Sequence, residues 1–130
     1  MALRDTKKYS LVSAGEVTGQ TTMVMEKDYR NVVFKVITSG FSGTLNFYHA
    51  EYDTAPDLSA ATSATNPWAA VQTANLDTGA LTGGTTGYTY TTNTAVEYFE
   101  LNTNLNVWAG AKYTRSAGTI TIEVILSDNQ

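Results

Sequence analysis

The sequence predicts an all-β protein: a two-sheet β-sandwich, jelly-roll-like, with about eight or nine strands. The apolar runs between Tyr9 and Leu126 are short, rich in β-branched and aromatic residues, and alternate with polar residues at a period of two. Gly, Thr, Asn and Asp separate these runs, and no segment has the apolar spacing of an amphipathic helix. A chain of 130 residues is long enough for one such domain.

The first eight residues are polar and basic and show no alternation, so residues 1–8 are predicted to form an extended N-terminal arm. Residues 9–130 are then a single β-sandwich domain. Its first strands are expected over residues 9–14 and 21–25. The next run, residues 32–38, places Val32, Phe34 and Val36 on one face and further apolar residues on the other, which predicts a central strand partly covered on each side.

Residues 40–43 contain two glycines and are predicted to form a turn. The following strand, residues 44–51, alternates cleanly, with Leu45 and Phe47 facing inward. Residues 52–66 are rich in Asp, Thr, Ala and Ser and predict a long loop. A strand over residues 71–76 follows it.

The C-terminal part is predicted to contain four more strands, over residues 88–91, 95–101, 107–114 and 119–126. Residues 115–118 end in glycine and predict a turn between the last two strands. In the final strand, four aliphatic residues are expected to face the core: Ile120, Ile122, Val124 and Leu126.

The composition excludes several classes of function. The chain has no cysteine, so it can form neither a disulfide framework nor a thiolate metal site. Lys and Arg are concentrated in the first 35 residues and are absent between Lys35 and Lys112, where carboxylates occur. A surface with that charge would repel a phosphate backbone, so we expect no nucleic-acid partner. Because no apolar run has the length of a signal or membrane helix, we expect a soluble protein made in the cytoplasm, without a membrane partner.

Few residues could coordinate a metal ion. His49 continues the inward register of its strand and is interpreted as a strand-end histidine, the alternatives being a ligand or a general base. Glu51, Asp53 and Asp57 could surround calcium, but their spacing lacks the ligand pattern of an EF-hand, which favours a solvated loop. We therefore predict neither a metal nor a cofactor.

The residues do not form a recognisable catalytic arrangement. Glu97 and Glu100 are close in sequence, but three residues apart on a strand they point to opposite faces and cannot act as a glycosidase pair by themselves. Ser39 and Ser42 lie in a glycine-rich segment that has no nucleophile-elbow motif. The sequence therefore predicts that the protein is not an enzyme.

Aromatic residues among polar Thr, Ser and Asn are the better candidates for a binding role, since planar rings stack on sugars or anchor protein interfaces. Tyr88 and Tyr90 share one face of a glycine-flanked strand and are predicted to form an exposed contact, together with Trp68. The alternative for Trp68 and Trp108 is that they close the two ends of the sandwich core.

The order of several segments resembles that of small virion structural proteins of tailed bacteriophages, most closely the capsid decoration (cement) proteins. The resemblance covers about three-quarters of the domain and leaves residues 1–30 outside. It rests on these segments: residues 33–36, 38–48, 66–68, 71–72, 75–77, 84–90, 98–104, 108–110 and 116–122. It implies a jelly-roll-like fold, no catalysis, and self-association, commonly as a homotrimer.

The resulting hypothesis is a phage decoration protein on the capsid exterior, which binds the major capsid protein and stabilises the shell by multivalent contacts. Arg4, Lys7 and Lys8 are the predicted capsid contacts. The alternatives are a glycan-binding module of a head fibre or baseplate that uses Trp68 and the two tyrosines, and a structural subunit of a tail or baseplate.

Overall fold

The computed structural model describes residues 6–25, 29, 31–82, 84–101 and 107–127. The described residues form nine β-strands and no helix, so the prediction of an all-β fold is confirmed. The strands are β1 (Thr6–Gly15), β2 (Gly19–Gln20), β3 (Val24–Met25), β4 (Asn31–Ala50), β5 (Ala69–Ala70), β6 (Thr73–Asn75), β7 (Leu81–Thr82), β8 (Tyr88–Leu101) and β9 (Trp108–Ser127).

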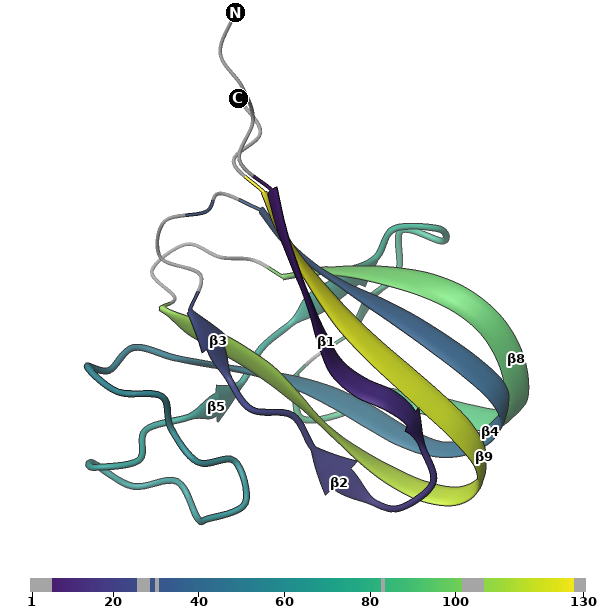
Figure 1. The fold of residues 1–130 in the computed structure, drawn as a ribbon, viewed down its shortest axis with the longest axis horizontal. Coiled ribbons are helices and arrows are strands. Elements are labelled where there is room, and N and C mark those ends of the chain that lie inside the picture. The colour runs from purple at the N-terminus through teal and green to yellow at the C-terminus, as the bar shows by residue number, and fades with distance from the viewer. Residues whose placement is uncertain (1–5, 26–28, 30, 83, 102–106, 128–130) are drawn as a thin grey trace, which may run out of the picture.

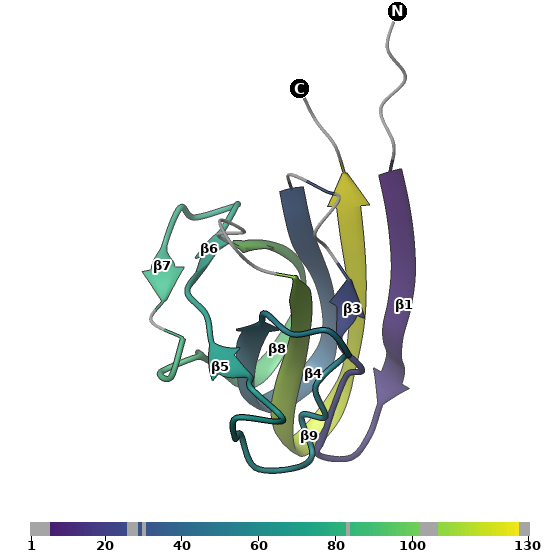
Figure 2. The same ribbon diagram turned by 90° about the vertical axis from the view of Figure 1, so that its left-hand side faces the viewer.

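All nine strands belong to one antiparallel sheet, in the order β1-β9-β4-β8-β6-β7. β2 and β3 extend the sheet along the first half of β9, and β5 pairs with the end of β4. β1 and β7 lie at opposite sides of the molecule (Figure 2). The segment predicted to be a central strand, residues 32–38, is central in the sheet because β9 and β8 flank it, and its outer face is partly buried.

The turns predicted at residues 40–43 and 115–118 do not reverse the chain. Each lies inside a single long strand, β4 or β9, and β8 likewise joins two predicted strands. Figure 1 shows all three strands curving sharply at the same edge of the molecule. The pairing of β4 with its neighbours shifts register between Ser39 and Gly43, which identifies a β-bulge.

Side-chain hydroxyls satisfy backbone groups along this bend. The Gly40 amide donates to Thr94 Oγ1 at 2.9 Å, and the Thr92 amide donates to Ser42 Oγ at 2.9 Å. Phe41 lies within the bulge yet is completely buried. The segment that resembles a turn in sequence is therefore a packed corner of the sheet.

The bend converts one sheet into the two layers of a sandwich. Phe34 and Phe47 are thirteen residues apart in β4, a separation that would span about 40 Å in a straight strand. Their ring centroids nevertheless lie 4.8 Å apart. The first layer contains β1, β6 and β7 with the first half of β4 and the second halves of β8 and β9. The second layer contains β2, β3 and β5 with the remaining halves.

The main core fills the space between the layers, and the predicted inward faces are confirmed. Each of the following residues is at most 1 % exposed: Val32, Phe34, Val36, Leu45, Phe47, Ile120, Ile122, Val124 and Leu126. Phe47 also contacts Phe99, with ring centroids 5.3 Å apart. Side chains from both layers thus meet around one aromatic centre.

The predicted N-terminal arm is shorter than expected, because Thr6, Lys7 and Lys8 already pair with β9 as the start of β1. The alternation signal missed these residues because an edge strand with exposed polar side chains on both faces has no apolar period. Arg4 lies outside the described residues.

Candidate binding surfaces

The two described lysines of the predicted capsid contact point to opposite faces of β1. Lys8 pairs in register with Ile125 on the outer face, and its ammonium lies 3.2 Å from the Glu123 carboxylate. Lys7 pairs with buried Leu126 and therefore lies on the other face. The two lysines do not form one basic patch, and an ion pair within the chain already engages Lys8.

The predicted exposure of Tyr88 and Tyr90 is wrong. Tyr90 is only 5 % exposed, and its ring packs against Phe41 at 5.5 Å. Tyr88 is half-buried, lies 4.5 Å from the Phe99 ring, and donates a hydrogen bond to the Thr73 carbonyl oxygen at 2.9 Å. The two tyrosines do share a face, but this face packs into the core.

Both tryptophans lie at the same end of the molecule rather than at opposite ends. Trp68 and Trp108 pack, with Tyr48, against a second small core cluster made of Met23, Ala50 and Leu58. The Trp68 indole N–H donates to the Ala60 carbonyl at 3.1 Å, and the Trp108 indole N–H donates to the Tyr52 carbonyl at 3.0 Å. The Trp68 bond joins two parts of the long loop after β4, and the Trp108 bond attaches this loop to β9 in the second layer.

Trp68 is part of an aromatic and cationic cluster on the outer face of the second layer. Its ring meets Tyr48 edge-on, at 5.1 Å and an interplanar angle of 89°. The Lys112 ammonium lies 4.9 Å from the Trp68 ring centroid and 5.9 Å from that of Tyr48. Sequence reasoning identified Trp68 but not its partners, since only the strand pairing brings Lys112 beside residues 46–48.

A shallow groove of about 210 Å³ adjoins this cluster. It crosses β2, β9 and β4, where Gln20 pairs with Lys112 and Lys112 pairs with Asn46. The remaining lining residues are Thr18, Gly19, Thr44, Tyr48, Tyr113 and Thr114.

The outer face of the first layer carries exposed apolar side chains. Leu81 is 65 % exposed, Val96 54 % and Tyr98 39 %, and Leu76 lies beside Tyr98, whose carbonyl accepts a bond from the Leu76 amide. The pairing of Val96 with Ile37 continues this surface onto β4. We call this set the outer apolar face: Val33, Ile37, Leu76, Leu81, Val96, Tyr98 and Ile125.

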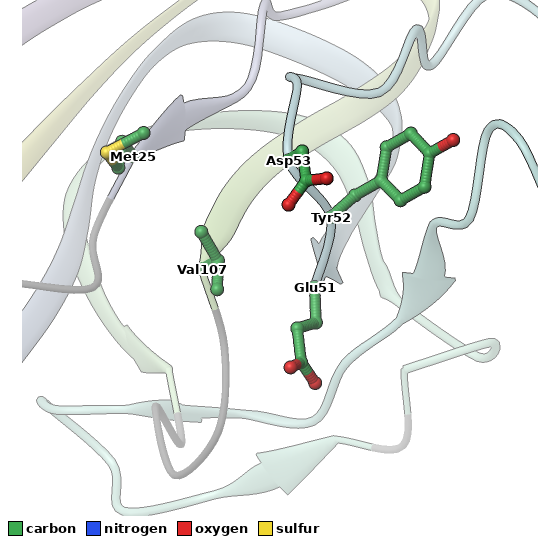
Figure 3. Close-up of a pocket in the computed structure, with 5 residues that line it drawn as sticks. All are labelled: Met25, Glu51, Tyr52, Asp53 and Val107. Carbon is green, nitrogen blue, oxygen red and sulfur yellow. The ribbon is translucent and has the colours of Figure 1, made fainter.

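A larger hollow of about 420 Å³ lies at the open end of the sandwich, lined by Met25, Glu51, Tyr52, Asp53 and Val107. Figure 3 shows the carboxylates of Glu51 and Asp53 lying apart, with the Glu51 carboxylate directed away from Asp53.

Asp57, the third residue of the possible calcium cluster, lines a different hollow. Hydrogen bonds from the Ser59 hydroxyl and amide, at 2.6 and 2.9 Å, lower the pKa of its carboxyl group. The three carboxylates are therefore not brought together.

The residues considered for catalysis are also separated. Glu97 faces inward and accepts a bond from the Asn75 side chain at 3.1 Å, whereas Glu100 is exposed on the outer face. His49 lies at the end of β4, paired with Ala69 and Ala109. In the described part of the chain, no three His, Asp or Glu side chains gather as metal ligands would. The same residues include no helix suited to crossing a membrane.

Comparison with known proteins identifies the fold alone. No protein-family model matches the sequence, and no curated protein matches it. Among solved structures, the chain is similar to the crystal structure of the SPBc2 prophage-derived protein YomS, with a TM-score of 0.74 and 13 % sequence identity. The likeness covers 98 % of this chain and 97 % of that one. The bent-sheet sandwich is thus a fold that this chain shares, over nearly its whole length, with a prophage-derived protein.

Proposed function

We propose that the chain is a structural protein of a phage particle, and that it decorates the exterior of the capsid by binding the major capsid protein. A phage origin agrees with the shared fold, since the similar structure is of a prophage-derived protein. The observation that carries the proposal is the outer apolar face. Four of its residues are among the most exposed large apolar side chains of the described chain: Leu76, Leu81, Val96 and Tyr98.

A group of exposed apolar side chains on one face favours a protein interface, because exposed apolar area is costly in water and is usually covered by a partner. Charged groups lie within it, since Lys35 stands between Val33 and Ile37 on β4 and pairs with Tyr98 and Glu123. Lys35 and Lys8 both approach Glu123, at 3.9 and 3.2 Å, and Glu100 is exposed beside Val33. Such a face combines apolar contacts with charged groups, which give a protein interface its specificity.

Decoration by this route needs no catalytic chemistry. We further propose that the chain self-associates as a homotrimer, which would present several copies of the same face to neighbouring capsid subunits. After the first contact, each later contact is intramolecular, so weak interfaces add up to stable attachment.

The outer apolar face is tested with the double variant Leu81→Thr, Val96→Thr on expanded, undecorated capsids of the parent phage. We expect half-occupancy of the capsid sites to require an about tenfold higher concentration of the variant, since hydroxyl groups replace apolar contacts in the interface. Val17→Thr is the matched control, because Val17 is 70 % exposed and lies outside this face. Unchanged binding by the double variant would overturn the proposed surface.

The N-terminal contribution requires a separate test, because removal of residues 1–8 would also delete the start of β1. Removal of residues 1–5 leaves the strand intact, and Lys7→Gln removes a charge that forms no ion pair with the described residues. A loss of binding in either variant supports a basic contact by Arg4 or Lys7.

Copy number separates shell decoration from the alternative of a tail or baseplate subunit. Quantitative mass spectrometry of purified particles should give a number that matches the capsid lattice. A number that matches a tail or a single vertex would replace the decoration proposal with the alternative.

A further inference from the structure

The groove beside Tyr48, Trp68 and Lys112 has features that assembly through the outer apolar face does not use. It lies on the second layer, whereas the outer apolar face belongs to the first. A strand row Gln20-Lys112-Asn46 forms its floor, and the aromatic pair lies at its side. The groove therefore presents an amide, an ammonium and an amide in one line across three strands.

Several polar groups of the groove have no partner within the described part of the chain. Lys112 forms no ion pair there, and the Gln20 side chain and the Tyr48 hydroxyl make no hydrogen bond with described residues. Burial raises the pKa of Tyr48, so this hydroxyl keeps its proton and remains a donor. Asn46 donates its amide N–H to the Gly84 carbonyl at 2.8 Å, which orients the side chain and leaves its oxygen as an acceptor.

The threonines on the other side of the groove are held in place by one another. The hydroxyls of Thr44 and Thr114 lie 2.7 Å apart, and the Thr44 amide donates to Thr114 Oγ1 at 3.0 Å. One of the two hydroxyls donates to the other, so at least one O–H remains to face a ligand. The floor and this side are thus fixed polar groups on strands rather than on loops.

The groove carries a positive charge in a protein whose net charge is −4. None of its lining residues is acidic, and the Lys112 ammonium is held over two aromatic rings rather than neutralised by a carboxylate. A ligand with a negative group would supply the missing partner for Lys112. The amide and hydroxyl groups around it suit a ligand rich in hydroxyls.

The size of the groove sets the scale of that ligand. About 210 Å³ is below the roughly 300–1,000 Å³ of pockets for drug-sized molecules, and the groove is open along the sheet. It therefore suits one ring of a longer chain rather than an enclosed small molecule. Polar floors beside aromatic rings are suited to sugar rings, whose C–H faces stack on aromatics while their hydroxyls bind amides.

We propose that this groove binds an anionic sugar unit of a polysaccharide, with Lys112 binding the acidic group and Gln20, Asn46 and Thr44 binding ring hydroxyls. The acidic group is a carboxylate, as in a uronic acid, or a phosphate, as in a sugar-phosphate polymer. The site is independent of capsid attachment, because the two surfaces lie on different layers. A particle that carries this protein would gain many weak sugar contacts at once.

The test is a titration of the full-length chain, followed by backbone amide chemical shifts, with D-glucuronic acid, D-glucose 6-phosphate, D-glucose and inorganic phosphate. We expect saturable shifts at Thr44, Asn46 and Lys112 with the two acidic sugars. Neutral glucose should bind about tenfold more weakly or worse, because it lacks the charge-assisted bond to Lys112. Tighter binding of glucuronic acid would indicate a uronic-acid polymer as the natural ligand, and tighter binding of glucose 6-phosphate would indicate a sugar-phosphate polymer.

The Lys112→Gln variant should lose the preference for acidic sugars, and Lys112→Arg should keep it. Lys35→Gln is the matched control, since it removes a lysine on the opposite layer. Equal affinity for glucose and glucuronic acid, or no effect of Lys112→Gln, would overturn the proposal. Inorganic phosphate binding as tightly as glucose 6-phosphate would reduce the site to an anion site and would also overturn it. None of these results bears on capsid binding, which is measured separately.

Discussion

Tyr90 carries a hydroxyl group into the core, where it forms no hydrogen bond of good geometry with a described residue. The same is true of Glu97 Oε1, which is also buried. Burial raises the pKa of Tyr90 above its usual value, and the negative charge of the Glu97 carboxylate and a weak hydrogen-bonding interaction with it raise the pKa further. A buried polar atom without a partner costs free energy relative to the unfolded state, where water satisfies it.

We therefore expect Tyr90→Phe to change the free energy of unfolding by less than about 1 kcal/mol, because it removes a hydroxyl that lacks a well-formed hydrogen bond and keeps the ring packed on Phe41. Urea unfolding at neutral pH measures this change. Tyr88→Phe is the matched control: it removes a hydroxyl that donates to Thr73, so it should lower stability by about 1 kcal/mol. Equal changes in stability for the two variants would contradict the difference in hydrogen bonding between the two tyrosine hydroxyls.

The raised pKa of Tyr90 also predicts a pH dependence. The unfolded chain releases this proton above pH 10.0, whereas the folded chain still holds it. The folded state then binds more protons than the unfolded state, so the stability present below pH 10.0 is lost as pH rises. Between about pH 9 and about pH 11, the free energy of unfolding should fall more steeply with rising pH in the wild type than in Tyr90→Phe. The same pH dependence of stability in both proteins would contradict the raised pKa of Tyr90.

At the level of single residues, burial could be predicted from the sequence where one face of an alternating strand is clearly polar. Leu45 and Phe47 alternate with Thr44 and Asn46, so their burial could be predicted. Tyr88 and Tyr90 alternate with threonines, which suit either face, so the period showed that they share a face but not which one. Lys112 could not be placed beside Trp68, because their proximity depends on the pairing of β4 with β9.

At the scale of elements, the bend in the three long strands depends on two facing glycines. Gly118 has a φ of +74°, and a Cβ atom there would collide with the carbonyl oxygen of Gly40 across the bend. Gly79 has the same φ of +74°, but a Cβ atom there would meet nothing within 4 Å. A comparison of alanine substitutions at Gly118 and Gly79 therefore separates the cost of backbone strain from the cost of a steric collision.

We expect Gly79→Ala to lower stability by about 1 kcal/mol from backbone strain alone. Gly118→Ala should cost about 3 kcal/mol or more, because β4 and β9 must also move apart at the corner. Thermal and urea unfolding followed by circular dichroism compare the two variants. Failure of Gly118→Ala to fold while Gly79→Ala folds agrees with the prediction, and equal costs would refute it.

The sequence could not distinguish this corner from two turns. Residues 40–43 and 115–118 contain the glycines that tight turns use, and a positive φ serves a bulge equally well. What decides between them is whether the flanking strands pair with each other or with common neighbours. Here β8 and β9 each continue along both halves of β4, so the chain bends and keeps its direction in the sheet.

At the scale of the whole molecule, the predicted all-β sandwich is correct in class, and its two layers have an origin that sequence did not reveal. The prediction assumed two separate sheets, which would meet only through side chains. In the structure, three strands run through both layers. The layers are therefore joined by continuous backbone as well as by the shared core.

This continuity predicts that neither layer unfolds alone. Ile122 is fully buried in the first layer, paired with Val36, while both tryptophans lie with the second layer. We expect Ile122→Ala to lower the free energy of unfolding by about 2–5 kcal/mol. Tryptophan fluorescence and far-UV circular dichroism should record the same loss, with coincident transitions. Val17→Ala, at a highly exposed position, should leave both signals unchanged. If the tryptophan transition of Ile122→Ala stays at its wild-type midpoint while the circular dichroism transition moves, the layers are separate folding units and the corner is only a hinge between them.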